Sequence, residues 1–443
     1  MPSSLSSSGP AVIVVGGGPA GATAARTLAM AGVRVTLLDR ASFPRNKPCG
    51  GAISARALKR FPHLERALSR IPVHRLSRLH LEGPKRRSTV VESDVPAALM
   101  IRRIEFDHLL VALAIEAGVE VVTGADIVQA VALPECVRLT ARDGRRFEAP
   151  LVVAADGVHS VVARRLGINP GWPAASIALD MMEETPREVM KDADPSLLWV
   201  AYGYDARGAD SGDAPIEGYS YVFPKRDHVN VGVGYVLDQY RRDVDARPYD
   251  VQARFVKHLR ERGVVDGRSV RRNFTPFLIP VGGPLRRPGR GRVLLAGDAG
   301  GFVNGFTAEG IYYAMVSGEL AGQAVVASLA DPSRLAGRYR RSCAREMGAE
   351  LRDSVSIRRY LFSHPRRIAA VIEGARRQPE TTRRVLDFAI GRLGYFALRR
   401  TLVAQAPRLA ATLVWNRVRE MLAPGPARRP LLERDASADR LVV

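Results

Sequence analysis

Three glycines near the N-terminus have the spacing of a phosphate-binding turn. Gly16, Gly18 and Gly21 form G-x-G-x-x-G after an apolar run (AVIVV) and before a stretch of helical composition (ATAARTLAMA). Glycines let the backbone approach a pyrophosphate, and the unpaired N–H groups of the helix N-terminus bind its oxygens. A second strand-like run (VRVTLL) ends at Asp39, whose carboxylate can accept ribose hydroxyl groups. The pattern predicts a dinucleotide site and is compatible with NAD or FAD.

Two later turns place an acidic residue after a strand-like run. Asp156 and Gly157 follow LVVAA, and Gly297 and Asp298 follow VLLA. A stretch of helical composition comes after each turn. Asp-Gly is also a common turn pair, so Asp156 is open to a purely structural interpretation.

The one cysteine inside a distinctive motif is Cys49, in FPRNKPCGGAIS. The chain has 3 cysteines, and the other two, Cys136 and Cys343, are far from it in sequence. An odd number of widely spaced cysteines indicates neither a disulfide framework nor a paired metal motif. The 8 histidines also lack metal-ligand spacing. We therefore expect no metal and a reducing, cytoplasmic compartment.

In this order the motifs resemble those of FAD-dependent oxidoreductases of the glutathione-reductase-like and hydroxybenzoate-hydroxylase-like class. The resemblance implies that Asp298 bonds the ribityl chain and that the segment from Ala308 to Ile311 approaches the flavin. It also implies that Arg103, in MIRRIEFDHLL, lies near the cofactor, with a surface salt bridge as the alternative. No second G-x-G-x-x-G marks a site for NAD(P)H. We therefore expect the electron donor, NAD(P)H or a small redox protein, to visit transiently.

Three elements narrow the resemblance to the geranylgeranyl reductase family. KPCGG matches the family's K-x-C-G-G element, which implies that its glycines admit the isoalloxazine and that Cys49 faces the reactive edge. GYSYVFP resembles P-x-x-Y-x-W-x-F-P, but Tyr221 stands where the family has tryptophan. NGFTAEGI resembles N-P-F-T-G-E-G-I, with Gly305 for proline and Ala308 for glycine. These departures imply a substrate pocket that differs from that of better-known members.

The resemblance implies that the protein saturates isoprenoid C=C bonds of a lipid, quinone or related polyprenyl substrate by hydride transfer from reduced FAD. An isolated alkene is a poor hydride acceptor, so an acid must protonate it. Cys49 is a candidate acid or flavin-tuning group, with a packing cysteine as the alternative. Period-two alternation places Tyr219, Tyr221 and Phe223 on one strand face, where their rings can stabilise positive charge or simply fill a core.

Two other classes of function stay open. The same scaffold supports FAD-dependent aromatic monooxygenases, in which reduced flavin reacts with oxygen. The basic C-terminal helices suggest a non-catalytic, membrane-recruited flavin-binding protein. Oxygen-dependent NAD(P)H consumption would indicate the first, and vesicle binding without substrate-linked flavin reoxidation would indicate the second.

These interpretations define the predicted site residues. The predicted catalytic residues are Cys49, Tyr219, Tyr221 and Phe223. The predicted cofactor-binding residues are Gly16, Gly18, Gly21, Asp39, Arg40, Lys47, Cys49, Gly50, Gly51, Arg103, Asp156, Gly157, Gly297, Asp298, Ala308, Gly310 and Ile311.

The order of the motifs predicts an α/β fold with a Rossmann-like FAD-binding domain around a mainly parallel sheet, an antiparallel-sheet substrate domain and C-terminal helices. We assign residues 10–75, 103–170 and 286–330 to the FAD-binding domain, 76–102 and 171–285 to the substrate-binding domain, and 331–422 to the helical region. Residues 1–9 and 423–443 are expected to be disordered.

The chain is strongly basic, with a formal net charge of +21, and arginine accounts for most of its positive residues. It has no zinc finger, RNA-recognition signature or basic stripe interleaved with aromatic residues, so we predict no nucleic-acid partner. Arginine pairs recur after residue 331, and YFALRRTLVAQAPRLAATLVWNRVREML is apolar on one side and basic on the other. These helices either contact a membrane surface as peripheral elements or pack on the FAD-binding domain with their arginines in water. No apolar run is long enough to cross a membrane.

Overall fold

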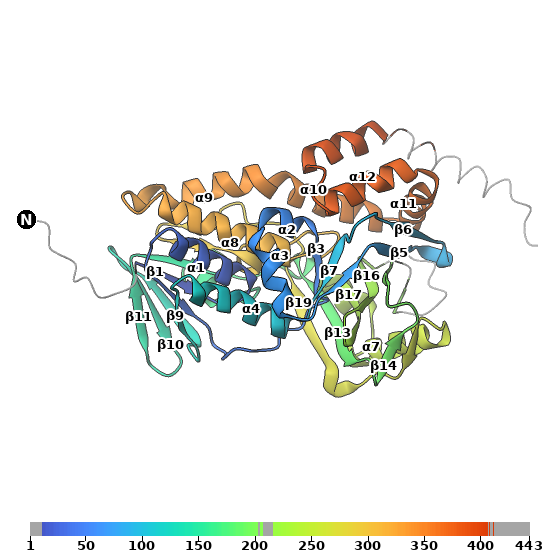
Figure 1. The fold of residues 1–443 in the computed structure, drawn as a ribbon, viewed down its shortest axis with the longest axis horizontal. Helices are drawn as coiled ribbons and strands as arrows, with labels where there is room; N and C mark the ends of the chain where they lie inside the picture. The colour runs from blue at the N-terminus through green and yellow to red at the C-terminus, as the bar shows by residue number, and fades with distance from the viewer. Residues whose placement is uncertain (1–10, 203, 207–215, 406, 408–410, 412–443) are drawn as a thin grey trace, which may run out of the picture.

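The computed structural model describes residues 11–202, 204–206, 216–405, 407 and 411 (Figure 1). The ends predicted to be disordered, 1–9 and 423–443, lie outside the described residues. The first core is a six-stranded sheet with strand order β20-β21-β12-β1-β2-β8. Its strands are β1 (Val12–Val15), β2 (Val35–Leu38), β8 (Glu120–Val122), β12 (Leu151–Ala154), β20 (Gly289–Arg290) and β21 (Val293–Leu295). All neighbouring strands pair in parallel except β20 with β21.

Both faces of this parallel sheet are covered, as its continuously apolar strands predict. Val12 and Val14 point to the cluster formed with α1 (Pro19–Met30), α4 (Arg103–Glu116) and α8 (Ile311–Val326). Alternation along the strand sends Ile13 and Val15 to the opposite face. That face is covered by α5 (Val161–Arg165) and by an antiparallel sheet. The sheet consists of β9 (Ile127–Ala132), β10 (Val137–Ala141) and β11 (Arg146–Ala149).

A seven-stranded sheet forms the second core, with strand order β19-β13-β17-β16-β15-β5-β6. Its strands are β5 (Arg78–Glu82), β6 (Ser88–Glu92), β13 (Ala178–Pro186), β15 (Leu197–Ala201), β16 (Gly218–Pro224), β17 (His228–Val236) and β19 (Phe274–Ile279). The pairing is antiparallel except between β15 and β5, which is parallel. The sheet's outer layer consists of α6 (Leu237–Asp243), α7 (Pro248–Glu261), β14 (Met190–Asp192) and β18 (Val265–Gly267).

A small third sheet joins the two halves, with strand order β3-β7-β4. It consists of β3 (Ala52–Ser54), β4 (His74–Leu76) and β7 (Ala98–Met100). The short helices α2 (Arg56–Arg60) and α3 (His63–Ala67) lie between β3 and β4 in the chain. The domain boundaries predicted from sequence cut through this sheet, because β3 falls in one predicted domain and β7 in the other, and the boundary after residue 75 divides β4. The division into domains stays a prediction.

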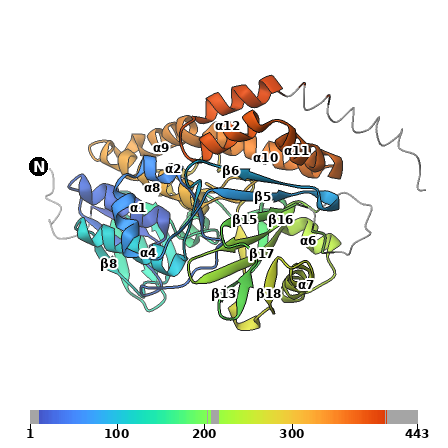
Figure 2. The ribbon, with the colours of Figure 1, turned by 45° about the vertical axis from the view of Figure 1, so that its right-hand side comes forward.

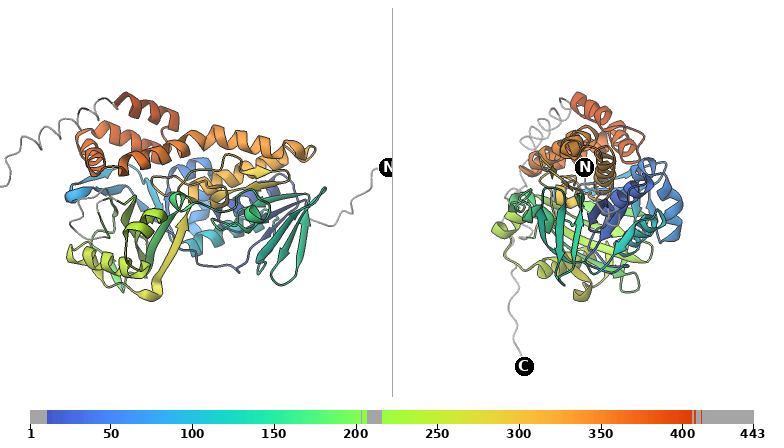
Figure 3. Two further views of the ribbon diagram at one scale, coloured as in Figure 1. Left: turned by 180° about the vertical axis from the view of Figure 1, so that it is seen from behind. Right: turned by 90° about the vertical axis from the view of Figure 1, so that its left-hand side faces the viewer.

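The C-terminal part is helical, as its composition predicts. It contains α9 (Leu335–Cys343), a π-helical turn (Ala344–Gly348), α10 (Ala349–Phe362), α11 (Pro365–Arg377) and α12 (Pro379–Ala389). Residues 395–405 are helical too, and the rest of the predicted helical region up to 422 lies largely outside the described residues. These helices form a layer along one side of the molecule, with α9 on α8 and α11 on β6 (Figures 2 and 3).

The remaining short helices connect these elements. They are the 3-10 helices η1 (Leu68–Arg70), η2 (Pro84–Arg86), η3 (Ala174–Ser176), η4 (Arg271–Asn273), η5 (Gly297–Gly300) and η6 (Pro332–Arg334). Within the described ranges, no helix is long and apolar enough to span a membrane. The predicted α/β class, with a mainly parallel sheet, a second antiparallel sheet and C-terminal helices, is confirmed.

Candidate active site

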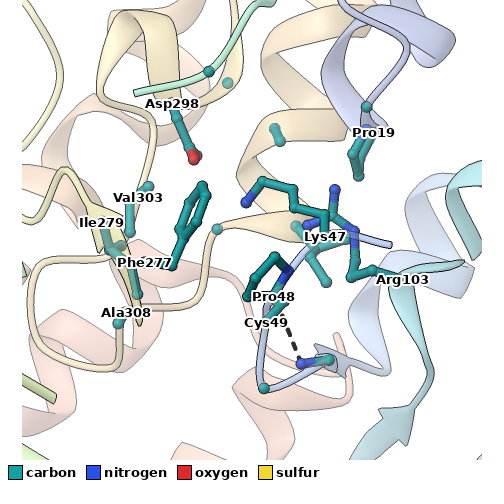
Figure 4. Close-up of a pocket in the computed structure, with 18 of the residues that line it drawn as sticks. Pro19, Lys47, Pro48, Cys49, Arg103, Phe277, Ile279, Asp298, Val303 and Ala308 are labelled. Carbon is teal, nitrogen blue, oxygen red and sulfur yellow. Dashed lines mark hydrogen bonds between the residues drawn. The ribbon is translucent and has the colours of Figure 1, made fainter. Parts of the chain in front are cut away.

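A cavity of about 830 Å³ lies between the six-stranded and seven-stranded sheets. Figure 4 shows part of its wall. Nearly all predicted site residues line it: Gly16, Gly18, Asp39, Arg40, Lys47, Cys49, Gly50, Gly51, Arg103, Asp156, Gly157, Tyr219, Tyr221, Phe223, Gly297, Asp298, Ala308, Gly310 and Ile311. The exception is Gly21, inside α1. A Cβ atom there would lie 1.8 Å from the carbonyl oxygen of Gly16, so this glycine permits close packing of helix on strand.

The first glycines form the predicted tight turn between β1 and α1. Gly16 has φ +98°, and an added Cβ would lie 2.3 Å from the carbonyl oxygen of Ala155. Gly18 is the N-cap of α1 and no side chain caps this helix. The guanidinium groups of Arg45 and Arg103 lie near Gly18, at 3.9 and 3.8 Å from the position of a Cβ. Free N–H groups beside two cations suit a pyrophosphate.

Asp39 organises the end of β2 as well as facing the cavity. Its Oδ2 accepts a hydrogen bond from the Gly17 N–H at 2.7 Å, and its Oδ1 accepts one from the Ala41 N–H at 2.8 Å. Arg45 lies 3.5 Å from Oδ2. Each carboxylate oxygen has a second lone pair. The carboxylate can therefore hold the glycine turn and still accept a ligand hydroxyl group.

Arg103 is a buried residue, so its interpretation as a surface salt bridge is wrong. Only 5% of its side chain is exposed, and its guanidinium donates to both carboxylate oxygens of Asp107 at 2.6 and 2.7 Å. Burial opposes its charge, but Asp107 outweighs this and raises the pKa of Arg103 above its ordinary value. Arg45 also contacts Asp107, at 3.1 Å. Two fixed cations thus lie at the N-terminal end of α1.

Asp156 has the structural role that its Asp-Gly sequence allowed. Its carboxylate accepts hydrogen bonds from the Ser160 hydroxyl group at 2.6 Å and from the N–H groups of Val161 and Val162 at 2.8 and 3.2 Å. These bonds hold the first turn of α5. Burial raises the pKa of Asp156 despite them. A contact between Asp156 and a cofactor stays a prediction.

The second acidic turn leads into a strained loop. Asp298 lies in η5 and points into the cavity near Lys47 (Figure 4). The Asn304 side chain accepts hydrogen bonds from the N–H groups of Phe306 and Thr307, both at 3.0 Å. Ala308 has φ +53°, the left-handed region, at a position where the family pattern has glycine.

The helix that follows this loop offers another anion site. Gly310 is the N-cap of α8, and no side chain caps that helix either. Its free N–H groups and the positive end of its dipole suit the electron-rich pyrimidine edge of a flavin.

The K-x-C-G-G segment forms another wall of the cavity. The Lys47 ammonium group lies 3.8 Å from the centre of the Phe277 ring, and burial, followed by repulsion from Arg103, lowers its pKa. Cys49 Sγ accepts a hydrogen bond from the Gly51 N–H at 3.4 Å. Gly51 has φ +71°, and an added Cβ would lie 2.1 Å from the carbonyl oxygen of Ile101. The cysteine and the second glycine therefore shape one tight turn.

The three predicted aromatic residues share one face of β16. The ring centroids of Tyr219 and Tyr221 are 6.0 Å apart, and those of Tyr221 and Phe223 are 4.3 Å apart. The Tyr219 hydroxyl group donates to the carbonyl oxygen of Thr307 at 2.6 Å. The aromatic face therefore contacts the loop that precedes α8.

Sequence reasoning missed several residues of this cavity. Tyr202 lies 5.9 Å from Tyr219 by ring centroids, and Asp180, on β13, faces the Tyr221 hydroxyl group. The signal for Asp180 was a single carboxylate within the strand-like run ASIALDMMEE. The signal for Tyr202 was the first of the two tyrosines in SLLWVAYGY.

The cavity extends away from the nucleotide motifs into an apolar region. Side chains from β5, β15 and α12 line this region, and they are Leu79, Leu81, Leu198, Val200, Leu386 and Ala389. The C-terminal helices therefore contribute to the cavity wall, which the sequence patterns do not indicate. The described part of the chain contains no cluster of three or more His, Cys, Asp or Glu side chains that could hold a metal ion.

Comparisons with known proteins agree with this geometry. The FAD binding domain family matches residues 10–344. Digeranylgeranylglycerophospholipid reductase 2 of Methanothermobacter thermautotrophicus is 30% identical over 364 residues, covering 79% of this chain and 87% of the relative. The chain belongs to the geranylgeranyl reductase family of FAD-dependent oxidoreductases. Menaquinone reductase of Mycobacterium tuberculosis is also similar to this chain, at 31% identity over 347 residues, 74% of this chain and 80% of the relative.

Solved structures show the same fold. A geranylgeranyl bacteriochlorophyll reductase-like protein of Thermoplasma acidophilum matches this chain with a TM-score of 0.70 and 20% identity, covering 82% of this chain and 90% of that one. A probable FAD-dependent monooxygenase from Pseudomonas aeruginosa matches with a TM-score of 0.61 and 18% identity, covering 82% and 99%. The fold is therefore shared by a protein described as reductase-like and by one described as a probable monooxygenase.

The predictions of the family, of an enzyme and of FAD are confirmed by these relatives. The cavity also fits FAD on its own features. It combines an uncapped helix N-terminus beside Arg45 and Arg103, a carboxylate at Asp39 and a second uncapped helix at Gly310. The individual contacts of these residues with FAD stay predictions.

Proposed function

We propose that this reductase saturates C=C bonds of a polyprenyl lipid, quinone or related isoprenoid substrate. The observation that carries the proposal is the apolar extension of the cavity, which is continuous with the wall formed by the nucleotide motifs. An extended isoprenoid chain can occupy the region between β5, β15 and α12 while one of its double bonds lies against Cys49 and the aromatic face of β16. The relatives act, by their names, on geranylgeranyl lipids and on menaquinone.

Reduced FAD, when bound in this cavity, would supply a hydride for the alkene. We propose that Asp39 binds ribose, that Arg103 and the N-terminus of α1 bind pyrophosphate, and that Asp298 binds the ribityl chain. The backbone from Ala308 to Ile311 would hold the pyrimidine edge of the flavin. The K-x-C-G-G turn, which lines the cavity, would form the wall on the substrate side of bound FAD. The Arg45 and Arg103 cations fit this assignment because both remain charged inside the protein.

The aromatic face has a role in the same reaction. Addition of a proton to a trisubstituted alkene places positive charge on the more substituted carbon. We assign stabilisation of that charge to the rings of Tyr219, Tyr221 and Phe223, since a desolvated cation–π contact contributes about 2 kcal/mol. Cys49 is assigned to the flavin-facing wall, where its thiol is one candidate for the proton donor.

Two further proposals concern the electron donor and the location of the protein in the cell. We propose NAD(P)H or a small redox protein as the electron donor, visiting transiently. We also propose peripheral contact with the cytoplasmic face of a membrane through the C-terminal helices. Exposed apolar side chains such as Tyr360, Val385 and Phe396 accompany the arginines of this region. A lipid substrate could then enter without crossing water.

An anaerobic experiment tests the reductase proposal. The purified protein is reduced, mixed with geranylgeranyl diphosphate or a menaquinone, and followed by flavin absorbance and product mass. We expect flavin reoxidation together with mass increases in steps of two hydrogens. If the flavin is reoxidised only after air is admitted, and an aromatic test compound is converted to an oxygenated product, the protein is instead a monooxygenase.

A further inference from the structure

Asp180 is a buried carboxylate inside the cavity that the sequence motifs leave without a role. It lies on β13 with 6% of its surface exposed. Alternation along β13 places Asp180, Met182 and Glu184 on one face, and Met182 packs in the cluster that contains Tyr221 and Phe223. Asp180 therefore projects from the face of the seven-stranded sheet that carries the aromatic residues.

The neighbouring carboxylate on that face has a different environment. Glu184 forms an ion pair with Lys225 and a second one with Arg102 at 2.7 Å. Among the described residues, no lysine or arginine forms an ion pair with Asp180. Its hydrogen-bond donor is the Tyr221 hydroxyl group, 3.1 and 3.3 Å from its two carboxylate oxygens. Asp180 is thus a buried acid whose direct partner is a phenol.

Gly232 of β17 makes room for this pair. Gly232 lies opposite Tyr221 in the sheet, and an added Cβ would lie 2.4 Å from the Tyr221 hydroxyl oxygen. Gly234 lies opposite both Asp180 and Tyr219. Tyr221 stands where the family pattern has tryptophan. An indole N–H can only donate a hydrogen bond, whereas a phenol hydroxyl group can donate and accept.

The groups around Asp180 favour an acid that stays partly protonated near neutral pH. Burial raises its pKa to about 6, and the Tyr221 hydrogen bond and the Lys47 ammonium group oppose this rise. Tyr219 and Cys49 also face this region. On the flanking strands the residues paired with Asp180 are Phe277 and Gly234, which carry no charge.

We propose that Asp180, hydrogen-bonded to Tyr221, is the acid that protonates the substrate double bond. The π electron pair of the alkene forms a C–H bond with the Asp180 proton, and the carboxylate is left behind. The more substituted carbon then receives the hydride, two electrons, that the reduced cofactor supplies, and the C=C bond is saturated. Solvent reprotonates Asp180, and the Tyr221 hydroxyl group stabilises the carboxylate until then. This inference rests on the proposed reductase function.

Asp180 fits this role better than Cys49 does. The Cys49 sulfur accepts the Gly51 N–H and belongs to a turn in which a glycine is required. Asp180 lies on β13, which pairs with strands on both sides. A carboxyl group is also a stronger acid than a thiol by several pKa units. The two candidates can therefore be separated by substitution.

The test compares Asp180→Asn with Cys49→Ser and with Glu183→Gln. Glu183 is the matched control, because it is a buried carboxylate on the same strand that bonds Val270 and Ser269 on the opposite face. Each FAD-loaded variant is reduced anaerobically, and flavin reoxidation by the prenyl substrate is measured from pH 5 to 8. Reoxidation by oxygen and melting temperature report whether the site remains intact.

We expect wild type to react faster below pH 6 and to slow as pH rises through the Asp180 pKa of about 6. Asp180→Asn should slow substrate-linked reoxidation by about 100-fold or more and lose this pH dependence, while reoxidation by oxygen is unchanged. Cys49→Ser and Glu183→Gln should keep the pH dependence. Infrared titration of the cofactor-free protein should show a carboxyl band near pH 6 that Asp180→Asn lacks.

Other results separate the inference from the function on which it rests. The assignment of Asp180 is wrong if the rate of substrate-linked reoxidation in Asp180→Asn is within a few-fold of the wild-type rate, or if Cys49→Ser is the variant that loses the pH dependence. The proposed reductase function is unaffected by either result. If wild-type flavin is not reoxidised by any prenyl substrate, both proposals fall.

Tyr221→Phe provides a second test that does not depend on the folding of Asp180→Asn. Loss of the hydroxyl group removes a hydrogen bond that stabilises the Asp180 carboxylate, so its pKa should rise. We expect the descending limb of the pH profile to move to higher pH in this variant. A limb that does not move would overturn the Asp180–Tyr221 pair as the source of the proton.

Discussion

At the scale of single residues, the cavity wall depends on backbone conformations that few side chains tolerate. Gly51 needs a positive φ and also has no space for a Cβ beside Ile101. Ala308 adopts the left-handed region although it has a side chain, at a cost of about 1–2 kcal/mol relative to ordinary helix. Gly51 lies in the K-x-C-G-G element, and Ala308 stands where the family pattern has glycine. Local strain of this kind is often retained where a ligand is held.

Gly51→Ala should release the cofactor more than it destabilises the protein. The added Cβ would push the K-x-C-G-G turn away from the Ile101 carbonyl group, and the turn contributes to the cavity wall. We expect the purified variant to contain much less flavin per chain, measured by absorbance. Gly118→Ala is the control, because Gly118 also has a positive φ but nothing lies near its Cβ. Equal flavin loss in both variants would contradict the role of the turn.

The residue scale also shows where sequence reasoning stopped. The glycine spacing and the alternation of Tyr219, Tyr221 and Phe223 are local properties, so they could be predicted. Asp180 and Tyr221 are 41 residues apart and meet only through the strand order of the sheet. Arg103 was ambiguous because burial of an arginine depends on elements that pack around it, and no local pattern reports this.

At the scale of elements, one arginine connects the cavity to the C-terminal helices. Arg56, at the start of α2, forms an ion pair with Glu350 of α10 at 3.0 Å and contacts Glu309 beside the cavity at 3.6 Å. It also donates to the Tyr313 hydroxyl group of α8 at 2.7 Å and lies 4.4 Å from the Phe388 ring of α12. Arg56 thus joins four helices and the loop that precedes α8.

Arg56→Met should destabilise this connection strongly. Removal of the guanidinium leaves Glu350 buried without its cation, and such losses typically cost about 3–5 kcal/mol. We expect a lower free energy of unfolding in denaturant titration. We also expect weaker flavin retention, because Arg56 contacts Glu309, and Glu309 lines the cavity and accepts a hydrogen bond from the Ser54 N–H.

Arg60→Met is the matched control for that variant. Arg60 is on the same helix, but its side chain and its partner Glu319 are partly exposed, so its ion pair should contribute only about 0–1 kcal/mol. Similar losses for the two variants would show that Arg56 has no special connecting role.

At the scale of the whole molecule, the C-terminal helices face outward and also line the cavity through α12. Leu386 and Ala389 lie in the cavity wall, while Val385 and Phe396 are exposed. The layer formed by these helices is separated from α7, which covers the outer face of the seven-stranded sheet (Figure 1). This arrangement places a basic, partly apolar surface next to the region proposed for the isoprenoid chain.

Binding to anionic vesicles should therefore depend on the C-terminal helices. We expect flotation with vesicles that contain an anionic lipid, and release at high salt, because surface charge is screened within about one Debye length. Arg383→Glu with Arg384→Glu should weaken binding by about tenfold or more, since each basic residue contributes about 1 kcal/mol. Arg254→Glu with Arg260→Glu on α7 is the matched control. Equal weakening by both pairs would indicate a nonspecific effect of net charge.

The sequence by itself determined the features that repeat over a few residues. These are the strand, turn and helix of the dinucleotide fingerprint, the acidic turns, the aromatic strand face and the helical C-terminal part. Tertiary structure decided which distant residues share one cavity. It buried Arg103 beside Asp107, placed α12 at the cavity wall and paired Asp180 with Tyr221. The physical reason is that periodicity and turn chemistry are local, whereas strand order, register and burial depend on the packing of the whole chain.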